Sequence, residues 1–458
     1  MKITKGKLVG NVVRWLIATV GIVWVISNLH IKDRVVALTP DDTPVERILA
    51  KPAGESADTF DVVTEKGVET LPRDRVINGP DRKTVTLPDG HVVPLLGMRL
   101  DGDINKHPHV HDLLIKDSSG KPTFIKPDDV AGGFNLDVPQ PRVKQGLGTM
   151  LGNANPWLII AAFATAVIPF VFTTIRWHKL LAALDVHLTM SRTLVLNMVG
   201  AFYNTFMPGS TGGDVLKAYY AAKQAPGKKT AAVMSVIIDR ILGLIALIIL
   251  GGTMAGVQWF SSPDKHEAVA RQCGHVALFA VAIIICCIIG SLVLFTPYVK
   301  KWIGLHRLMG HHPIYAKLQN IMRIMHDYRR RPGLVVWAIL ITMPVHAAVV
   351  VSAMFAGKAF GLPISAEYYF IVVPVVVLAG SIPISPQGVG VMEAFAFYLT
   401  RPQGVTLNQA LALTMSIRLV GIFWNLVGGF FVLKGGFHAP TEAERHEVEE
   451  VEEAEAAV

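Results

Sequence analysis

The strongest constraint on the fold of this chain is a set of apolar segments, each long enough to cross a membrane as a helix. A hydrocarbon core about 30 Å thick needs roughly 20 mostly apolar residues in a helix. Six segments meet this requirement: Val9–Leu29, Pro156–Ile175, Ala231–Trp259, Val276–Tyr298, Leu334–Phe355 and Leu407–Leu433. The composition agrees, since 51% of the 458 residues are hydrophobic and 17% are charged. We therefore expect an all-α polytopic membrane protein with about six transmembrane helices.

The net charge of +8 does not indicate nucleic-acid binding, because the basic residues lie beside the ends of the apolar segments. Membrane proteins keep such residues on the cytoplasmic side. Cys286 and Cys287 fall inside an apolar segment and Cys273 stands alone, so they form neither a disulfide framework nor a metal quartet. We expect no nucleic-acid partner, no cofactor and no metal.

Two different parts precede the main group of apolar segments. Residues 1–29 carry basic residues before a long apolar run without a convincing cleavage site, which predicts a retained signal anchor with a cytoplasmic N-terminus. Residues 30–150 are polar, rich in proline and broken by turn signals, which predicts an extracytoplasmic β-rich domain. The predicted strands are Phe60–Val63, Thr84–Leu87 and Leu113–Lys116, and the predicted hairpin turns are Glu65–Gly67, Pro88–Gly90 and Ser118–Gly120.

Two patterns stand out within this β-rich domain. The stretch "FDVVTEKGVETLPRDRV" resembles "LLIKDSSGKPTFIKPDDV", which suggests a duplicated hairpin unit. His107, His109 and His111 alternate and would share one face of a strand, as a metal site could require. A solvated surface cluster is the favoured interpretation, because no further ligand pair completes a coordination shell.

Two charged segments lie in the second half of the chain, one between two apolar segments and one after the last of them. Residues 300–331 form a basic amphipathic segment, which predicts contact with anionic lipid at the cytoplasmic surface, with an ordinary cytoplasmic loop as the alternative. Residues 435–458 are rich in Glu and Ala and predict an acidic cytoplasmic tail. The expected location is the cell inner membrane, with both termini in the cytoplasm.

Two further apolar segments are broken in the middle by proline and glycine. Residues 193–223 have basic residues on both flanks and are too short for two spans, which predicts a re-entrant hairpin entered from the cytoplasm. Residues 367–399 follow a span that leaves the cytoplasm, so their hairpin should enter from outside. The breaks contain Gly212 and Gly213 before Asp214, and Gly388 and Gly390 before Glu393.

The two hairpins are each followed by a span that carries an arginine and then a glycine. Arg240 lies 28 residues after Gly212, and Arg418 lies 28 residues after Gly390. A broken hairpin followed by such a span, repeated with the opposite side of entrance, is typical of an inverted-topology repeat. Chance similarity between glycine-rich apolar segments is the alternative.

The charges inside the membrane are the candidate site. Asp239 points about 100° away from Arg240 on a helix, so Asp214 and Glu393 are the expected partners of Arg240 and Arg418. Two arginines near the midplane, beside hairpin glycines and helix N-termini, would bind a phosphate or carboxylate. The alternative is that these acids and arginines only lock the bundle. His346, Asn197, Asn204 and Asn425 are predicted to make interhelical hydrogen bonds.

At these residues the chain resembles the flippase-like membrane domain of bacterial lysylphosphatidylglycerol synthases and of many stand-alone membrane proteins. The resemblance covers residues 151–434 and rests on four motifs: "RWHKLL" from Arg176, "FYNTFMPGSTGGDVLKAYY" from Phe202, "SVIIDRILGL" from Ser235 and "IPISPQGVGVMEA" from Ile382. It implies movement of a lipid or lipid-linked glycan with an anionic headgroup between leaflets. No aminoacyl-transferase domain follows Leu433, and the β-rich domain lies outside the family's usual pattern.

Two other functions remain open at this point. One is a membrane-embedded transferase that uses Asp214 or Glu393 as a base, although no phosphate-binding GxxxxGK[ST] loop and no nucleophile triad is found, so an enzyme is not expected. The other is a non-transporting scaffold whose β-rich domain binds an envelope protein.

Overall fold

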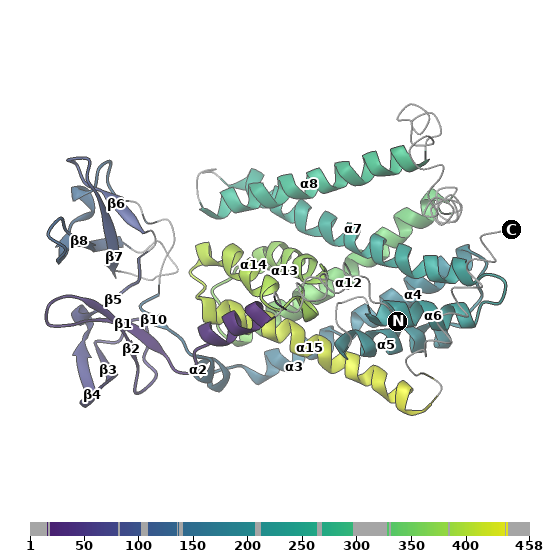
Figure 1. Cartoon of the computed structure of the whole chain (residues 1–458), viewed down its shortest axis with the longest axis horizontal. Coiled ribbons are helices and arrows are strands. Elements are labelled where there is room, and N and C mark those ends of the chain that lie inside the picture. Colours follow the sequence, from purple (N-terminus) through teal and green to yellow (C-terminus); the bar gives the residue numbers. More distant parts are fainter. Residues whose placement is uncertain are drawn as a thin grey trace.

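The computed structural model describes residues 16, 19–80, 83–101, 109–134, 136, 141–206, 212–262, 268–295, 328, 331–382, 385–435 and 437. A small β domain lies at one end of an elongated helical part (Figure 1). The anionic-lipid segment expected at residues 300–331 and the acidic tail fall almost entirely outside the described residues, as do the first 15 residues of the signal anchor and His107.

The β domain consists of short antiparallel strands. They are β1 (Arg34–Leu38), β2 (Pro44–Ile48), β3 (Thr59–Thr64), β4 (Gly67–Pro72), β5 (Val76–Ile77), β6 (Thr84–Thr86), β7 (Val92–Asp101), β8 (His109–Lys116), β9 (Pro122–Ile125) and β10 (Val143–Lys144). Strand β1 pairs with β2, β5 and β10, β3 pairs with β4, and β6 to β9 form a sheet in sequence order. The three predicted strands and the three predicted hairpin turns are confirmed.

The two similar stretches of the β domain adopt the same local structure. In each, a hairpin, β3–β4 or β8–β9, leads into a short 3-10 helix, Arg73–Arg75 or Pro127–Asp129. A buried valine, Val76 or Val130, follows each of these helices. The predicted hairpin unit therefore occurs twice.

One of the histidines of β8, His111, lies beside a carboxylate. Asp112 pairs with His111 Nδ1 at 2.8 Å and with Lys126 Nζ at 2.8 Å. Partial burial raises the pKa of Asp112, but these two partners outweigh it and hold that pKa below its usual value. Across the described residues, no group of three or more His, Cys, Asp or Glu side chains could hold a metal ion.

The helical part contains α2 (Leu147–Gly152), α3 (Pro156–Thr165), α4 (Ile168–Ala183), α5 (Met190–Phe206), α6 (Gly212–Lys223), α7 (Lys229–Ser261), α8 (Ala268–Phe295), α12 (Pro332–Ala359), α13 (Ala366–Ser381), α14 (Val391–Thr400) and α15 (Leu407–Leu433). Five candidate spans are long and apolar enough to cross a membrane: α3 with α4, α7, α8, α12 and α15. They confirm five of the six predicted spans. The segment predicted as a signal anchor contains, in its described part, the shorter apolar helix Thr19–Asn28.

Local sequence signals fix where the spans begin. Pro156 occupies the first turn of α3, where its missing N–H is harmless, and Asn155 Oδ1 accepts a hydrogen bond from Trp157 N at 3.0 Å. Thr406 and Gln409 cap α15 reciprocally through their side chains. Both of these starts lie at the end of the bundle that carries the β domain (Figure 1).

Each broken segment forms two helices that pack against each other. The pair α5–α6 has helices of 17 and 12 residues, and the pair α13–α14 has helices of 16 and 10 residues, all short of the roughly 20 that cross a bilayer. The pair α13–α14 lies toward the β domain and α5–α6 toward the opposite end (Figure 1). Helix α15, which follows the pair α13–α14, packs against α5 of the other pair. Helix α7, which follows the pair α5–α6, packs against α13 in the corresponding way.

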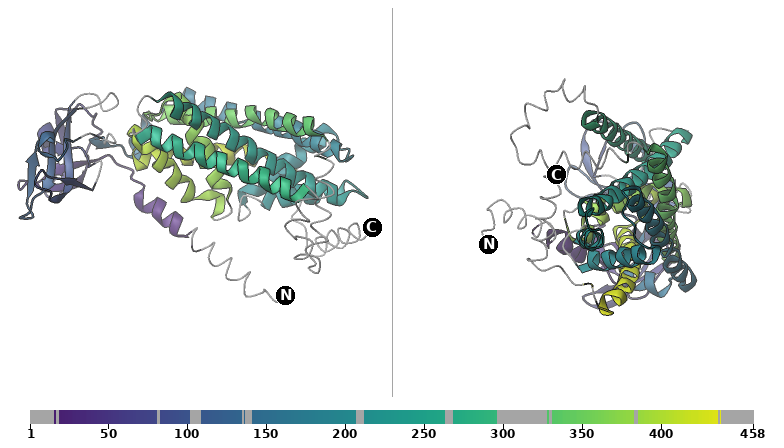
Figure 2. Two further views of the ribbon diagram at one scale, coloured as in Figure 1. Left: turned by 90° about the horizontal axis from the view of Figure 1, so that it is seen from above. Right: turned by 90° about the vertical axis from the view of Figure 1, so that its right-hand side faces the viewer.

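One asparagine ties the β domain to the membrane bundle. Asn408, in the first turn of α15, donates to the carbonyls of His30 at 3.0 Å and Gln145 at 2.8 Å and accepts from His30 N at 3.1 Å. Both ends of the β domain are thereby held on the start of α15. Figure 2 shows from two further directions how the domain continues the long axis of the bundle.

Candidate functional site

A cavity of about 370 Å³ opens among α4, α5, α6, α7, α12 and α13. Five charged side chains line it: Arg176, Asp214, Lys217, Asp239 and Arg240. The remaining lining is mainly apolar. Three cations therefore face two carboxylates in a space bounded by membrane helices.

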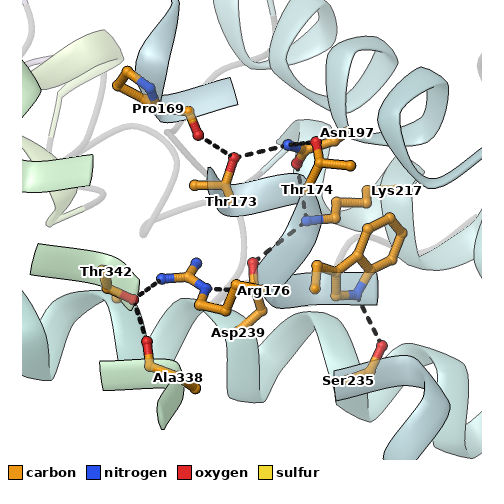
Figure 3. Close-up of polar contacts among 12 residues, drawn as sticks. Pro169, Thr173, Thr174, Arg176, Asn197, Lys217, Ser235, Asp239, Ala338 and Thr342 are labelled. Carbon is orange, nitrogen blue, oxygen red and sulfur yellow. Dashed lines mark hydrogen bonds and ion pairs between the residues drawn. The ribbon is translucent and has the colours of Figure 1, made fainter. Parts of the chain in front are cut away.

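Asp239 is the centre of a buried ion triad in this cavity (Figure 3). Its Oδ1 accepts from Arg176 Nε at 2.7 Å and its Oδ2 pairs with Lys217 Nζ at 3.4 Å. The three side chains are 10%, 6% and 5% exposed, respectively. An unpaired charge at membrane depth costs from about 2.5 to more than 10 kcal/mol, so each member needs the others. The triad joins α4, α6 and α7.

The two cations of the triad differ in how many of their hydrogen-bond donors have a partner. Lys217 Nζ also donates to Asn197 Oδ1 at 3.1 Å and lies 3.9 Å above the ring of Trp177, which engages the whole ammonium group. Arg176 donates from Nη1 to Thr342 Oγ1 at 2.7 Å, as Figure 3 shows. Its Nη2 makes no further hydrogen bond within the described part of the chain and lies over Gly243, whose missing side chain leaves that side open.

The two expected acid–arginine pairs are both formed. Arg240 Nη1 lies 2.9 Å from Asp214 Oδ2, and Arg418 Nη1 lies 2.7 Å from Glu393 Oε1. The acids are the third residues of α6 and α14, and the arginines are the twelfth residues of α7 and α15. The prediction that Asp214 and Glu393, rather than Asp239, pair with these arginines is confirmed.

The environments of these pairs nevertheless differ. Arg240 and Asp214 are 35% and 25% exposed and line the cavity, whereas Arg418 and Glu393 are 15% and 0% exposed and do not line it. Glu393 also accepts from Gly390 N at 2.7 Å and from Thr414 Oγ1 at 3.2 Å. The N-terminus of α14 is therefore occupied by its own carboxylate, and this cavity does not hold both arginines as expected.

Three of the four hairpin glycines, Gly213, Gly388 and Gly390, allow close packing of neighbouring backbone segments. A Cβ on Gly213 would collide with the carbonyl oxygen of Gly200 on α5. Gly390 has φ +86° and lies against Gly21 of the N-terminal helix, and Gly388 packs against Gly380. Neither these glycines nor Gly212 are among the residues that line the cavity, and at Gly213, Gly388 and Gly390 neighbouring backbone lies too close to leave room for a ligand.

Polar residues predicted to join helices do so. His346 Nε2 lies 2.9 Å from Gly243 O, and Asn204 Oδ1 accepts from Gly213 N at 2.8 Å. Asn425 donates to Thr205 Oγ1 at 3.1 Å. Gln387, in the second break, donates to Thr205 O at 3.1 Å and so links both broken segments.

Arg176 and Lys217 were missed by the sequence reasoning. Arg176 was taken as the cytoplasmic end of a span that stops at Ile175, but α4 continues to Ala183 and buries it. Lys217 was not among the candidate site residues. A usable signal was present, because Lys217 follows Asp214 by three residues and stands among Leu216, Ala218 and Tyr219, all buried.

Comparison with known proteins gives one family. The family described as "Lysylphosphatidylglycerol synthase TM region" matches residues 144–429. A UPF0104 membrane protein of Methanocaldococcus jannaschii is 21% identical over 62% of this chain and 86% of its own length. UPF0104 membrane proteins of Methanothermobacter thermautotrophicus and Pyrococcus horikoshii are each 22% identical over 60% of this chain, and 83% and 86% of their own lengths. With its five candidate spans, this chain belongs to the membrane-protein family of the lysylphosphatidylglycerol synthase TM region.

Proposed function

We propose that this protein moves a lipid or lipid-linked intermediate with an anionic headgroup from one leaflet to the other. The observation that carries the proposal is the cavity with three cations and two carboxylates. Such an excess of positive charge between membrane helices is stabilised by an anion, and an arginine with an unused Nη2 can donate to phosphate. The family name, which refers to a phospholipid-synthesising enzyme, is in keeping with a lipid.

The inverted repeat is the second part of the proposal. Helices α5, α6 and α7 would correspond to α13, α14 and α15, with each pair of broken helices re-entering the membrane from its own side. The matched positions of the two acid–arginine pairs and the reciprocal packing of α7 on α13 and of α15 on α5 support this relation. Movement of one half against the other would expose the cavity to each leaflet in turn.

The halves are specialised in this proposal. With Asp214 matched to Glu393 and Arg240 to Arg418, Lys217 corresponds to Ala396 and Asp239 to Ile417. The buried triad thus belongs to one half only. We assign headgroup binding to the half with Arg176 and Arg240, and a structural role to the Arg418–Glu393 pair.

Orientation follows from the charges at the bundle ends. Lys179, Arg192, Lys223, Lys228 and Lys229 lie at the end remote from the β domain, which predicts that this end is cytoplasmic. We expect a membrane-impermeant maleimide to label Ser56→Cys in intact right-side-out membrane vesicles. Glu447→Cys should be labelled only after the vesicles are permeabilised. Labelling at position 447 before permeabilisation would contradict the scheme.

Transport itself is tested in reconstituted vesicles. We expect the wild-type protein to move a fluorescent anionic phospholipid between leaflets, and Arg240→Lys to slow it severalfold, because lysine keeps the charge but loses the planar fork. The measurement is reduction of the outer-leaflet fluorophore over time. Arg192→Lys, at the exposed start of α5 and outside the cavity lining, is the matched control and should retain the wild-type rate. No transport above empty vesicles, with the protein folded, would contradict the proposal.

A further inference from the structure

A narrow apolar space lies between the polar cavity and an apolar groove formed by α7 and α8. Leu247 lines both the cavity and a narrow space of about 30 Å³, and Ile248 and Ile283 line both that space and a wider groove of about 300 Å³. The narrow space is lined only by apolar residues of α7, α8 and α13, so it offers no partner to a charged headgroup. The cavity, the narrow space and the groove therefore adjoin one another in that order.

Side-chain sizes explain why the groove exists. A Cβ on Gly252 of α7 would collide with Ala280 of α8, so these two small residues let the helices touch. About one to two turns from this contact, toward the start of α7 and toward the end of α8, isoleucines replace them and hold the helices apart. The groove is lined there by Ile245, Ile248, Ile249, Ile283, Ile284 and Ile288 with Cys287.

The groove faces the side of the bundle that contacts lipid. Helix α8 lies at the edge of the bundle beside α7, as the views of Figures 1 and 2 agree. On its outer surface, Val281, Ile285 and Ile289 are 52%, 48% and 53% exposed. The lining contains no nitrogen or oxygen side-chain atom, so it fits a hydrocarbon chain and gives no partner to a polar group.

We propose that the α7–α8 groove binds the hydrocarbon tail of the lipid whose anionic headgroup occupies the polar cavity. This inference rests on the proposed function for the identity of the headgroup. The occupant follows from this adjacency, since the cavity and the narrow space share Leu247, and the narrow space and the groove share Ile248 and Ile283. Hydrocarbon gains little free energy on moving from lipid to such a groove. The groove therefore positions the tail, while the headgroup supplies selectivity.

Two neighbouring native cysteines provide the test. Cys287 lines the groove, whereas Cys286 is also exposed, lies one residue away and is not part of the lining. A benzophenone maleimide is attached to Cys287 in a Cys286→Ala variant, and to Cys286 in a Cys287→Ala variant. Each protein is reconstituted into vesicles of equal amounts of phosphatidylcholine and phosphatidylglycerol, irradiated, and its lipid adducts are identified by mass spectrometry.

We expect phosphatidylglycerol adducts to exceed phosphatidylcholine adducts severalfold at Cys287 and to match the bilayer composition at Cys286. Adding Arg176→Gln should abolish the enrichment at Cys287, because the headgroup no longer holds its tail there. Bilayer composition at both cysteines, or adducts with a second copy of the chain at Cys287, would overturn the inference. If either of these results is found together with normal transport, the groove proposal fails and the proposed function stands. If phosphatidylglycerol is enriched at Cys287 but no lipid is transported, only the proposed function fails.

Discussion

Replacing Glu393 by alanine is expected to destabilise the helical part by about 3–5 kcal/mol, because it removes the only ionic partner that the structure shows for Arg418. Glu393 is 0% exposed, so water does not replace the carboxylate. The Gly390 amide and the Thr414 hydroxyl lose an acceptor in the same substitution. The measurement is the free energy of unfolding in mixed micelles, followed by tryptophan fluorescence.

Glu367→Ala is the matched control for this substitution. Glu367 is an exposed acid in the first turn of α13, within the same pair of broken helices, and its loss should change the free energy of unfolding by less than about 0.5 kcal/mol. The double variant Glu393→Gln/Arg418→Gln removes both charges and should be less destabilised than the sum of its single variants. A loss below about 1 kcal/mol for Glu393→Ala, or strict additivity, would contradict a structural lock.

Replacing Arg176 by glutamine is expected to slow lipid transport about ten- to a hundredfold, since a hydrogen bond to a charged group contributes about 1.5–3 kcal/mol. The substitution leaves two cations and two carboxylates in the cavity and so removes its positive excess. The fold should survive better than in Glu393→Ala, because Asp239 keeps Lys217 as a partner. Rates of leaflet exchange and the free energy of unfolding are measured on the same preparations.

Arg192→Gln supplies the control for the loss of an arginine. Arg192 is exposed at the start of α5, where it donates to Gln224 at 2.8 Å, and it does not line the cavity. Its transport rate should remain near that of the wild type. A wild-type rate for Arg176→Gln, or a rate that falls only as far as the folded fraction does, would show that the triad is purely structural.

The sequence determined the features that depend on residues near one another in the chain. Apolar length predicted five confirmed spans, and turn residues predicted the three hairpins of the β domain. The angle of about 100° between neighbouring helix residues excluded Asp239 as the partner of Arg240 and favoured Asp214 and Glu393 as the partners of Arg240 and Arg418.

Tertiary packing alone decided which charges share a cavity. Arg176 and Asp239 are separated by 63 residues, and their contact depends on how α4 crosses α7. Hydropathy predicted that Arg176 lies outside the membrane, because Arg176 is the first charged residue after the apolar segment Pro156–Ile175. The two arginines with equal sequence spacing also received unequal surroundings: Arg240 faces the cavity, whereas Arg418 lies against Glu393 and the Gln387 carbonyl. Spacing along a helix fixes which neighbours a side chain can reach, but only the approach of other helices fixes whether space remains beside it.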